Sequence, residues 1–490
     1  MRRWAWLGMA LCLGACDDAD EAQAGGQGAC VATAPTLAHR RLRASGTVLI
    51  DAAGRQVLLR GVNAGGRSKL PPFLPFPFAE SARPDQADAP PFDEAVAAYA
   101  ERARAWGLNV ARVPFTWEAL EPTRGQLDEA WLRRYIDLVR ALGERDIRVI
   151  VDFHQDVFHR VFCGDGFPDW ALPDADYTTP PDCTTWFTGY LSDPQVQLAY
   201  DRFWANEDGL RDAFRAMWTT MATRLWAEPN VIGFEIINEP GWGTADPAAW
   251  ARDVLAPFYA ELADVVHAVA PDALVFVDST GTEAITARTA LPRPAATGLV
   301  FAPHFYDAGV ILRGMWSGVG GFVEPLGRWA DVGQAWGVPV LLGEYGIPGA
   351  APGAEGYVAE HQAALDALGL HGTLWEYSAT ADDWNGEGMS IYHPARGEAP
   401  TARALARPYP EAIAGAGLAF EYDPATRTLT LSFDAEPGGT STLRVPDALF
   451  TDRLRAEITA GDGCLTAEGG RVHLLAPTGG RISAILTQAE

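Results

Sequence analysis

Two glutamates stand at the ends of strongly apolar segments. Glu239 ends residues 231–239 and Glu344 ends residues 338–344, and a proline or glycine follows each within two positions. Because an apolar strand is buried, a glutamate at its last position lies where the sheet meets a cleft. Cleaving a glycosidic bond needs one carboxyl group to donate a proton and a second, ionised one to attack or to activate water. The pair therefore predicts glycosidic chemistry; the alternative for either glutamate alone is a structural role at a strand end.

Polar side chains at other strand ends fit the same chemistry. Arg112 closes residues 109–114, and a buried arginine there needs a carboxylate, so we expect it to orient and ionise a catalytic glutamate. Asn238 precedes Glu239 and is expected to offer its amide to the sugar 2-hydroxyl. Tyr306 is expected to donate a hydrogen bond to the nucleophile.

Four more residues complete the expected rim. His154 and Asp156 follow a third apolar segment and suit hydrogen bonds to sugar hydroxyls, although His154 could instead be a core histidine bonded to a backbone carbonyl. His304 stands near Tyr306 as catalytic support. Trp375 offers a flat face for a pyranose ring, with a core position as the alternative.

The elements that must position these residues alternate between strands and helices. Strands are predicted over residues 58–63, 109–114, 148–154, 231–239, 273–278, 298–304, 338–344 and 372–375. Helices are predicted over residues 92–106, 131–145, 210–226, 250–269 and 356–368. A hairpin over residues 47–63 leads into the first barrel strand. This pattern predicts an α/β fold, a (β/α)8 TIM barrel, with Glu239 on strand four and Glu344 on strand seven.

The composition changes near residue 405. From residue 417 onward short alternating strands with Gly and Pro turns predict a small C-terminal β-sandwich. We assign residues 36–405 to the barrel and 410–490 to the sandwich. The sandwich carries no catalytic constellation, so a structural role is expected, with carbohydrate or membrane binding left open.

The amino terminus has the features of an export signal. Arg2 and Arg3 precede an apolar run over residues 4–13, and two small residues then lead to Cys16. Residues 1–16 are interpreted as a lipoprotein-type signal with Cys16 as the lipidated residue, and residues 17–35 as a flexible tether. The alternative is an ordinary signal peptide. Either way we expect an extracytoplasmic protein, anchored in a bacterial cell envelope or secreted.

The cysteines and the net charge limit which bonds and binding partners are expected. Cys163 could close the loop to Cys183 as a disulfide, and Cys30 could pair with Cys464; a zinc site competes, but the spacing of ligands is wrong for it. The net charge of -25 on 490 residues argues against binding to a nucleic acid backbone.

Together these motifs resemble clan A glycoside hydrolases of family 5. Residues 60–71, residues 152–158 with 164–166, and the C-terminal sandwich resemble endoglycoceramidases within that family. The resemblance implies a retaining enzyme that cuts between glycan and ceramide, with Glu239 as acid/base, Glu344 as nucleophile, and no cofactor or metal. It also implies that Lys69 and Asp156 bind sugar.

Two other functions remain open at this point. One is a family 5 β-glycanase or β-glucosidase acting on polysaccharide or simple glucosides. The other is a carbohydrate-binding protein built on an inactive barrel, which the intact pair of glutamates disfavours.

The mechanism sets further expectations. Glu344 must be anionic, and Glu239 must be protonated, its pKa raised by burial and by the charge of Glu344. A carboxyl separation near 5 Å is expected, as roughly in other retaining enzymes. Apolar residues 70–78 and 309–322 are candidates for contacting lipid, unless they pack on the barrel.

Overall fold

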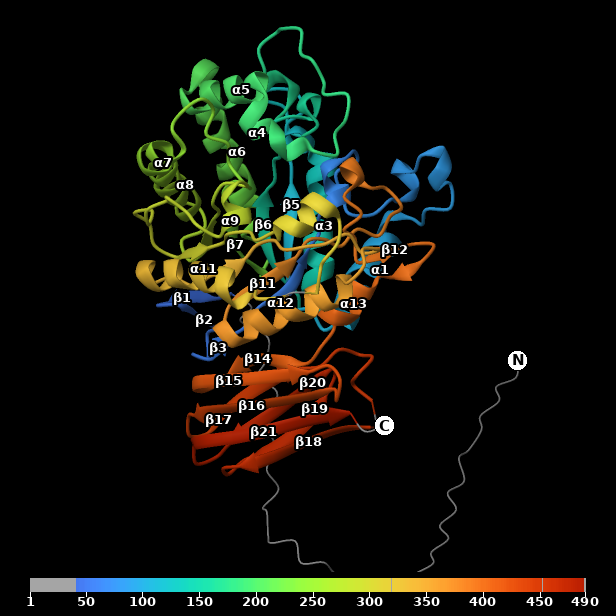
Figure 1. Cartoon of the computed structure of the whole chain (residues 1–490), viewed down its shortest axis with the longest axis vertical. Coiled ribbons are helices and arrows are strands. Elements are labelled where there is room, and N and C mark those ends of the chain that lie inside the picture. The colour runs from blue at the N-terminus through green and yellow to red at the C-terminus, as the bar shows by residue number, and fades with distance from the viewer. Residues whose placement is uncertain (1–40, 319, 452, 489–490) are drawn as a thin grey trace, which may run out of the picture.

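The computed structural model describes residues 41–318, 320–451 and 453–488 (Figure 1). The predicted signal and tether, with Cys16 and Cys30, lie outside these residues. Figure 1 shows a large part in which helices surround a sheet and, below it, a smaller strand-rich C-terminal part. Within the described ranges, no helix is both long and apolar enough to cross a bilayer.

Eight parallel strands form the sheet of the larger part, in the order β10-β11-β4-β5-β6-β7-β8-β9. They are β4 (Arg60–Asn63), β5 (Val110–Phe115), β6 (Arg148–Phe153), β7 (Val231–Glu235), β8 (Leu274–Val277), β9 (Leu299–Phe301), β10 (Leu341–Leu342) and β11 (His371–Leu374). Parallel bridges join Phe301 to Val340 and His304 to Glu344, so the two edge strands meet and the sheet closes. The predicted TIM barrel is confirmed.

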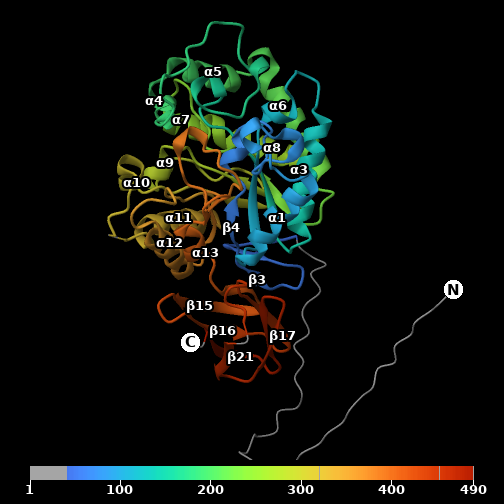
Figure 2. The same cartoon turned by 90° about the vertical axis from the view of Figure 1, so that its right-hand side faces the viewer.

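Helices cover the outside of the barrel (Figures 1 and 2). The longer ones are α1 (Phe92–Ala105), α3 (Glu129–Gly143), α5 (Pro194–Trp204), α6 (Leu210–Leu225), α8 (Ala256–His267), α11 (Val323–Trp336) and α12 (Ala354–Leu368). The shorter ones are α2 (Trp117–Leu120), α4 (Gly189–Ser192), α7 (Pro247–Trp250), α9 (Glu283–Thr286), α10 (Ala308–Arg313) and α13 (Pro400–Leu405). The helix predicted over residues 250–269 is interrupted by a π-helical turn, Ala251–Leu255. Pro257 follows it and lacks a backbone donor.

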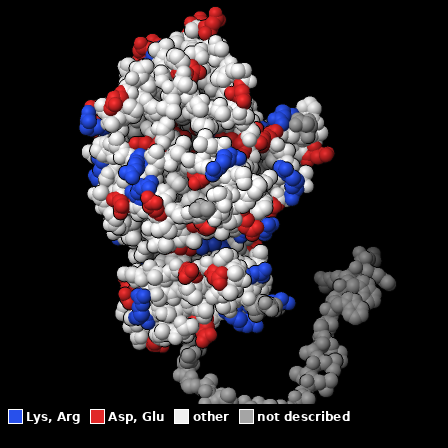
Figure 3. Space-filling model, in the orientation of Figure 1, with Lys and Arg blue, Asp and Glu red and all other residues white. Residues whose placement is uncertain are grey.

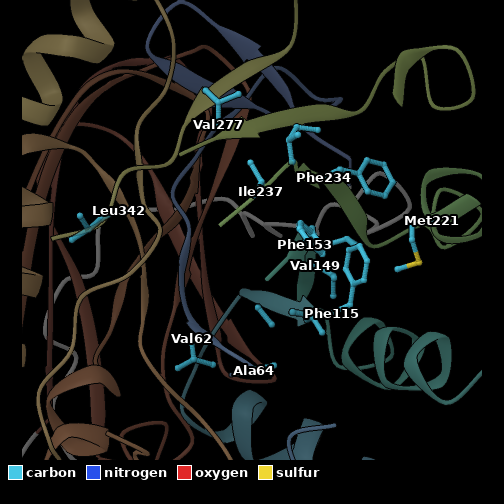
Figure 4. Packing of buried hydrophobic residues seen from close by; sticks show 14 of the residues in the cluster. Val62, Ala64, Phe115, Val149, Phe153, Met221, Phe234, Ile237, Val277 and Leu342 are labelled. Carbon is cyan, nitrogen blue, oxygen red and sulfur yellow. The ribbon is translucent and has the colours of Figure 1, made fainter. Parts of the chain in front are cut away.

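Successive residues of a barrel strand face opposite sides, and their burial follows that alternation. Ile150 of β6 belongs to an inner cluster with Leu274 and Leu341, whereas its neighbours Val149 and Val151 belong to the outer cluster. In the outer cluster, phenylalanines of the strands point toward Met221 on α6 (Figure 4). The strands are therefore held from both sides, which fixes the positions of the side chains at their carboxyl ends.

The C-terminal part is a sandwich of two antiparallel sheets, as predicted. A seven-stranded sheet has the order β1-β2-β3-β14-β17-β20-β19, and a four-stranded sheet has the order β15-β16-β21-β18. The strands are β1 (Arg43–Ser45), β2 (Val48–Ile50), β3 (Gln56–Val57), β14 (Tyr409–Ile413), β15 (Gly415–Asp423), β16 (Thr428–Ala435), β17 (Gly439–Arg444), β18 (Leu454–Ala460), β19 (Cys464–Glu468), β20 (Arg471–Ala476) and β21 (Gly480–Gln488). The predicted hairpin forms as β2 and β3, and β3 pairs with β14 of the sandwich.

A buried carboxylate connects the two parts. Glu411 on β14 contacts Arg148 on barrel strand β6 at 3.7 Å, Arg444 at 3.2 Å and Arg471 at 3.1 Å. Burial disfavours its charge, but the three arginines outweigh burial and lower the pKa of Glu411 to about 2. On the outer surface, acidic and basic side chains are interspersed over the face seen in Figure 3.

Candidate active site

The predicted site residues gather at the carboxyl ends of the barrel strands. The sequence predicted that Glu239 is the last residue of its strand. Strand β7 instead ends at Glu235, so Glu239 lies in the turn beyond it. Its backbone takes a left-handed φ of 37°, and its N–H donates to Oδ2 of Asp278 at 3.0 Å. Glu344 likewise lies just beyond β10, which ends at Leu342.

The two glutamates face each other across a small gap. One carboxylate oxygen of Glu239, one of Glu344 and a ring nitrogen of His304 all lie within 4.8 Å of one another. This limit is compatible with the expected separation near 5 Å, roughly the spacing of retaining enzymes.

Glu344 is held as a hydrogen-bond acceptor on both oxygens. Nη1 of Arg112 donates to Oε1 at 2.7 Å, and the hydroxyl of Tyr306 donates to Oε2 at 2.9 Å. Arg112 is itself fully buried and also donates to both oxygens of Glu235, at 2.8 Å each. Its Nη2 lies 3.1 Å from Asp152. The sequence analysis missed Glu235 and Asp152 as partners because both lie inside strands, where only their neighbours reveal them.

Asn238 and Asn63 complete the arginine's environment. Nη2 of Arg112 donates to Oδ1 of Asn238 at 2.8 Å, and Nη1 donates to Oδ1 of Asn63 at 2.9 Å. The Asn238 amide also donates to the carbonyl of Gln155 at 3.1 Å, which fixes its orientation. One N–H of Asn238 therefore remains for another acceptor.

Glu239 has an environment that favours its protonated form. Burial, and next the charge of Asp156, raise the pKa of Glu239 to about 7. The largest neighbouring repulsion therefore comes from Asp156, whereas the sequence led us to expect Glu344. Oε1 lies 2.8 Å from Nδ1 of His304. Burial lowers the pKa of His304 to about 4, so this imidazole is neutral near pH 7.

Lys69 lies among aromatic rings on the other side of the gap. Its ammonium forms an ion pair with Asp156 and lies 3.8 Å from the ring centroid of Trp384, 4.4 Å from that of Trp375 and 5.5 Å from that of Trp186. Cation–π contacts of this kind stabilise a buried ammonium. Trp186 and Trp384 were not predicted, since each begins a 3-10 helix of only three residues, which is too short to show periodicity.

His154 joins Trp375 to the acidic groups. Its ring stacks on Trp375 with centroids 5.2 Å apart, and its Nδ1 lies 2.8 Å from Asp152. Burial and Lys69 disfavour the imidazolium, but Asp152 and Asp156 outweigh both and raise the pKa of His154 to about 10. The alternative of a core histidine bonded to a backbone carbonyl does not describe this side chain.

These residues surround a cavity of about 310 Å³. Its polar and aromatic lining residues include Lys69, Asp156, Glu239, Tyr306, Glu344, Trp375 and Glu387. Its apolar lining residues include Phe187, Leu191, Ala284, Ile285, Val310, Ile311, Pro348 and Met389. The other predicted residues do not line the cavity: Arg112, His154 and His304 contact lining carboxylates, and Asn238 contacts Arg112.

The two apolar segments proposed to contact lipid behave differently. Within residues 70–78, Leu74, Phe76 and Phe78 are buried, and both phenylalanines pack against Phe92 of α1. This part of the prediction was wrong, because the proline-stiffened loop covers the barrel. Within residues 309–322, by contrast, Leu312 is 80% exposed beside the cavity wall formed by α10.

A disulfide fixes the segment that forms one wall of the cavity. Cys163 and Cys183 are bonded, as predicted, and Trp186 and Phe187 follow directly. The amide of Asn385 donates to the carbonyl of Cys163 at 2.7 Å and ties this wall to the loop that carries Trp384. The predicted pairing of Cys30 with Cys464 involves a residue outside the described ranges.

Three clusters of this site have donor atoms close enough to bind a metal ion. They are His154, Asp156 and Asp165; Glu235, Asp278 and His304; and Glu239, His304 and Glu344. Each cluster already contacts a side-chain cation: Lys69 forms an ion pair with Asp156, and Arg112 forms ion pairs with both Glu235 and Glu344. Each cluster thus contains a carboxylate that already has a cationic partner.

Two family models match the chain. The model for cellulase (glycosyl hydrolase family 5) matches residues 82–381, and the model for the glycoside hydrolase family 5 C-terminal domain matches residues 407–481.

Curated proteins and solved structures that resemble the chain include endoglycoceramidases. Endoglycoceramidase I of Rhodococcus hoagii is 27% identical over 459 residues, which are 89% of this chain and 86% of that protein. An endoglycoceramidase of Cyanea nozakii is 33% identical over 189 residues, 33% of this chain and 37% of that protein. The structure of endo-glycoceramidase II from Rhodococcus sp. in a ganglioside GM3 complex superposes with a TM-score of 0.72 at 22% identity, covering 91% of this chain and 100% of that one. Because the family model spans more than half of the sequence, the chain belongs to glycosyl hydrolase family 5.

Proposed function

We propose that the protein is a retaining endo-β-glycosidase that hydrolyses the bond between glycan and ceramide in glycosphingolipids. The observation that carries the proposal is a cavity whose lining contains both the two glutamates and a set of aliphatic side chains. Glu239 and Glu344 have carboxylate oxygens within 4.8 Å of each other, and the aliphatic lining includes Leu191, which is 61% exposed. A substrate that is half sugar and half lipid matches both.

In the first step Glu344 acts as nucleophile. Its carboxylate attacks the anomeric carbon of the sugar and forms a glycosyl-enzyme ester, while Glu239 donates its proton to the oxygen that leaves with ceramide. Arg112 and Tyr306 keep the attacking carboxylate in place through hydrogen bonds of 2.7 Å and 2.9 Å.

In the second step Glu239 acts as base. It takes a proton from water, the resulting hydroxide attacks the anomeric carbon, and the ester bond to Glu344 breaks. The product sugar keeps its β configuration because each displacement inverts the same carbon.

The sugar is bound by the remaining polar side chains. Trp375 offers its ring face to the pyranose, Lys69 and Asp156 hydrogen-bond hydroxyls, and His154 holds Trp375 and Asp156 from behind. Asn238 offers its remaining N–H to the 2-hydroxyl, a contact that strengthens in the transition state.

The lipid is received by the wall that α10 and the segment after Cys183 form. Leu191, Val310 and Ile311 line the cavity, and Leu191 is 61% exposed. Leu312 follows Ile311 on α10 and is 80% exposed. Exposed aliphatic side chains that continue a cavity wall are typical of sites that bind apolar ligands. The alternative family 5 function, on polysaccharide, gives these side chains no partner.

A substrate panel tests the proposal. With detergent present, we expect cleavage of lactosylceramide or a ganglioside to yield intact oligosaccharide and ceramide, with little activity on cellulose or mannan. Steryl and acylglycerol glucosides distinguish ceramide from other lipids. Preferred hydrolysis of a polysaccharide would overturn the proposal in favour of a β-glycanase.

Two sets of variants separate catalysis from lipid binding. Glu344→Gln should abolish activity on both glycolipid and aryl glycoside. Leu312→Ser with Leu191→Ser should raise KM for the glycolipid alone, by several-fold, since each removes apolar area. Leu127→Ser is the matched control, because Leu127 is 37% exposed and lies neither in the cavity lining nor on α10.

We also propose that the protein works outside the cytoplasm, held in the envelope through Cys16. The Cys163–Cys183 disulfide supports an oxidising compartment. Incorporation of labelled fatty acid into the wild type, and its loss in Cys16→Ser, tests the anchor; incorporation that persists in that variant would contradict it.

A further inference from the structure

Asp165 is a buried carboxyl group that the reaction described above does not use. Its exposed fraction is 0%, and within the described residues neither of its oxygens accepts a hydrogen bond. An ionised carboxylate without a donor in such a place is strongly unfavourable, because water has been removed and nothing replaces it.

The chain is shaped to put Asp165 beside Asp156. The two residues form an antiparallel bridge, in which Asp165 N–H donates to the Asp156 carbonyl at 3.0 Å and Asp156 N–H donates back at 3.3 Å. Residues opposite each other in such a bridge point their side chains to the same face. The residues on either side of Asp165 are both glycines. A Cβ on Gly164 would lie 1.7 Å from the Asp156 carbonyl oxygen, and one on Gly166 would lie 2.3 Å from Cβ of Gln155.

The charged groups around the pair all engage Asp156. Lys69 forms its ion pair with Oδ2 of Asp156, and Nε2 of His154 lies 3.5 Å from the same oxygen. One oxygen of Asp165, one of Asp156 and a ring nitrogen of His154 lie within 4.8 Å of one another. Two carboxyl groups this close do not both ionise readily. Burial, and next the charge of Asp156, hold the pKa of Asp165 well above its ordinary value.

We propose that Asp165 is a positioning residue that keeps its proton and donates it in a hydrogen bond to the Asp156 carboxylate, thereby holding Asp156 against Lys69 at the sugar-binding side of the cavity. This inference rests on the proposed function for the role of Asp156 and Lys69. A divalent cation at the same cluster is the competing arrangement, but Oδ2 of Asp156 already pairs with the Lys69 ammonium.

Three variants test the hydrogen bond. Asp165→Asn keeps a donor and cannot ionise, so it should retain most of the kcat/KM for glycolipid. Asp165→Leu has a similar volume and no donor, and should lose roughly 10- to 100-fold, mostly in KM, as expected when a hydrogen bond to a charged group is removed. Asp156→Asn makes the same chemical change in the ionised partner and should lose at least as much as Asp165→Leu.

A spectroscopic measurement tests the proton without using activity. The infrared difference spectrum between wild type and Asp165→Asn at neutral pH should contain the C=O stretching band of a protonated carboxyl group. That result does not depend on which glycoside is hydrolysed, so failure of the proposed function leaves it standing.

Four results would overturn the inference. They are the absence of that infrared band, a folded Asp165→Asn variant as impaired as Asp156→Asn, an Asp165→Leu variant as active as Asp165→Asn, and activity that a chelator removes and a divalent cation restores. Near-ultraviolet circular dichroism checks the fold of each variant. If Asp165→Leu does not fold, the activity of Asp165→Asn and the infrared band still test the proposed hydrogen bond.

Discussion

Nδ1 of His304 lies 2.8 Å from Oε1 of Glu239, in the wall between the two catalytic candidates. The same nitrogen lies 3.6 Å from Oε2 of Glu344. Because burial lowers the pKa of His304 to about 4, this link between the carboxyl groups is uncharged near neutral pH. In the proposed mechanism the proton for the leaving group therefore comes from Glu239, and His304 orients that carboxyl group.

The pH dependence of the reaction follows from Glu239. Its pKa is raised to about 7 and its protonated form is the active acid, so kcat/KM should fall as pH rises through 7. Asp156→Asn removes the largest neighbouring repulsion, which lowers the pKa of Glu239 and should move this alkaline limb to lower pH. The shift of the alkaline limb is measured from kcat/KM for a glycolipid at a series of pH values. An aryl glycoside whose leaving group needs no proton is the control, and an unmoved limb in the variant would contradict the assignment.

Tyr306 should contribute to catalysis without contributing much to stability. Tyr306→Phe removes the donor 2.9 Å from Glu344, and kcat/KM should fall roughly 10- to 100-fold because the acceptor is charged. Tyr99→Phe is a matched control, since the Tyr99 hydroxyl donates to the Tyr377 carbonyl away from the reacting groups. Equal activity of Tyr306→Phe and wild type would remove Tyr306 from the mechanism.

Gly281 should be required for the position of Glu239. A Cβ at residue 281 would lie 2.4 Å from Oε2 of Glu239, so Gly281→Ala should displace that carboxyl group and lower kcat by about 100-fold. Gly327→Ala is the control, because open space surrounds Gly327 within helix α11. It should leave kcat unchanged and raise the unfolding free energy by about 0.5 to 1 kcal/mol. A fully active Gly281→Ala variant would be inconsistent with this geometry.

The contact between barrel and sandwich should depend on pH through Glu411. Its pKa is lowered from 4.5 to about 2 in the folded protein, so its stabilising contribution is complete above pH 4.5 and is lost as pH falls through about 2. The difference corresponds to about 3 kcal/mol. Glu411→Gln should lower the unfolding free energy at pH 7 by that order and weaken its dependence on acid. Urea unfolding at several pH values measures both, and an unchanged acid dependence would count against this role.

Much of this molecule follows from local sequence patterns. Fully buried parallel strands are mostly apolar, so the eight runs were visible, and a glutamate at the end of such a run stands out. The helices over residues 92–106 and 210–226 were predicted for the same reason, since their apolar residues recur with helical spacing. Alternating residues with frequent turns likewise predicted the sandwich.

Other features depend on contacts between distant segments. The pairing of β3 with β14 joins the start of the chain to the sandwich, and the sequence of neither strand reveals it. The apolar loop 70–78 and the exposed helix α10 have similar compositions, and only packing against α1 decides that the first is buried.

The sequence by itself determined which chemistry the protein can perform, because carboxyl groups at the ends of apolar strands are a local property of the chain. The tertiary structure decided the protonation states that the chemistry needs. The pKa of Glu239 is set by burial and by Asp156, a residue on a different strand end. Electrostatic interactions depend on distance and on the exclusion of water, and both arise only when the barrel closes.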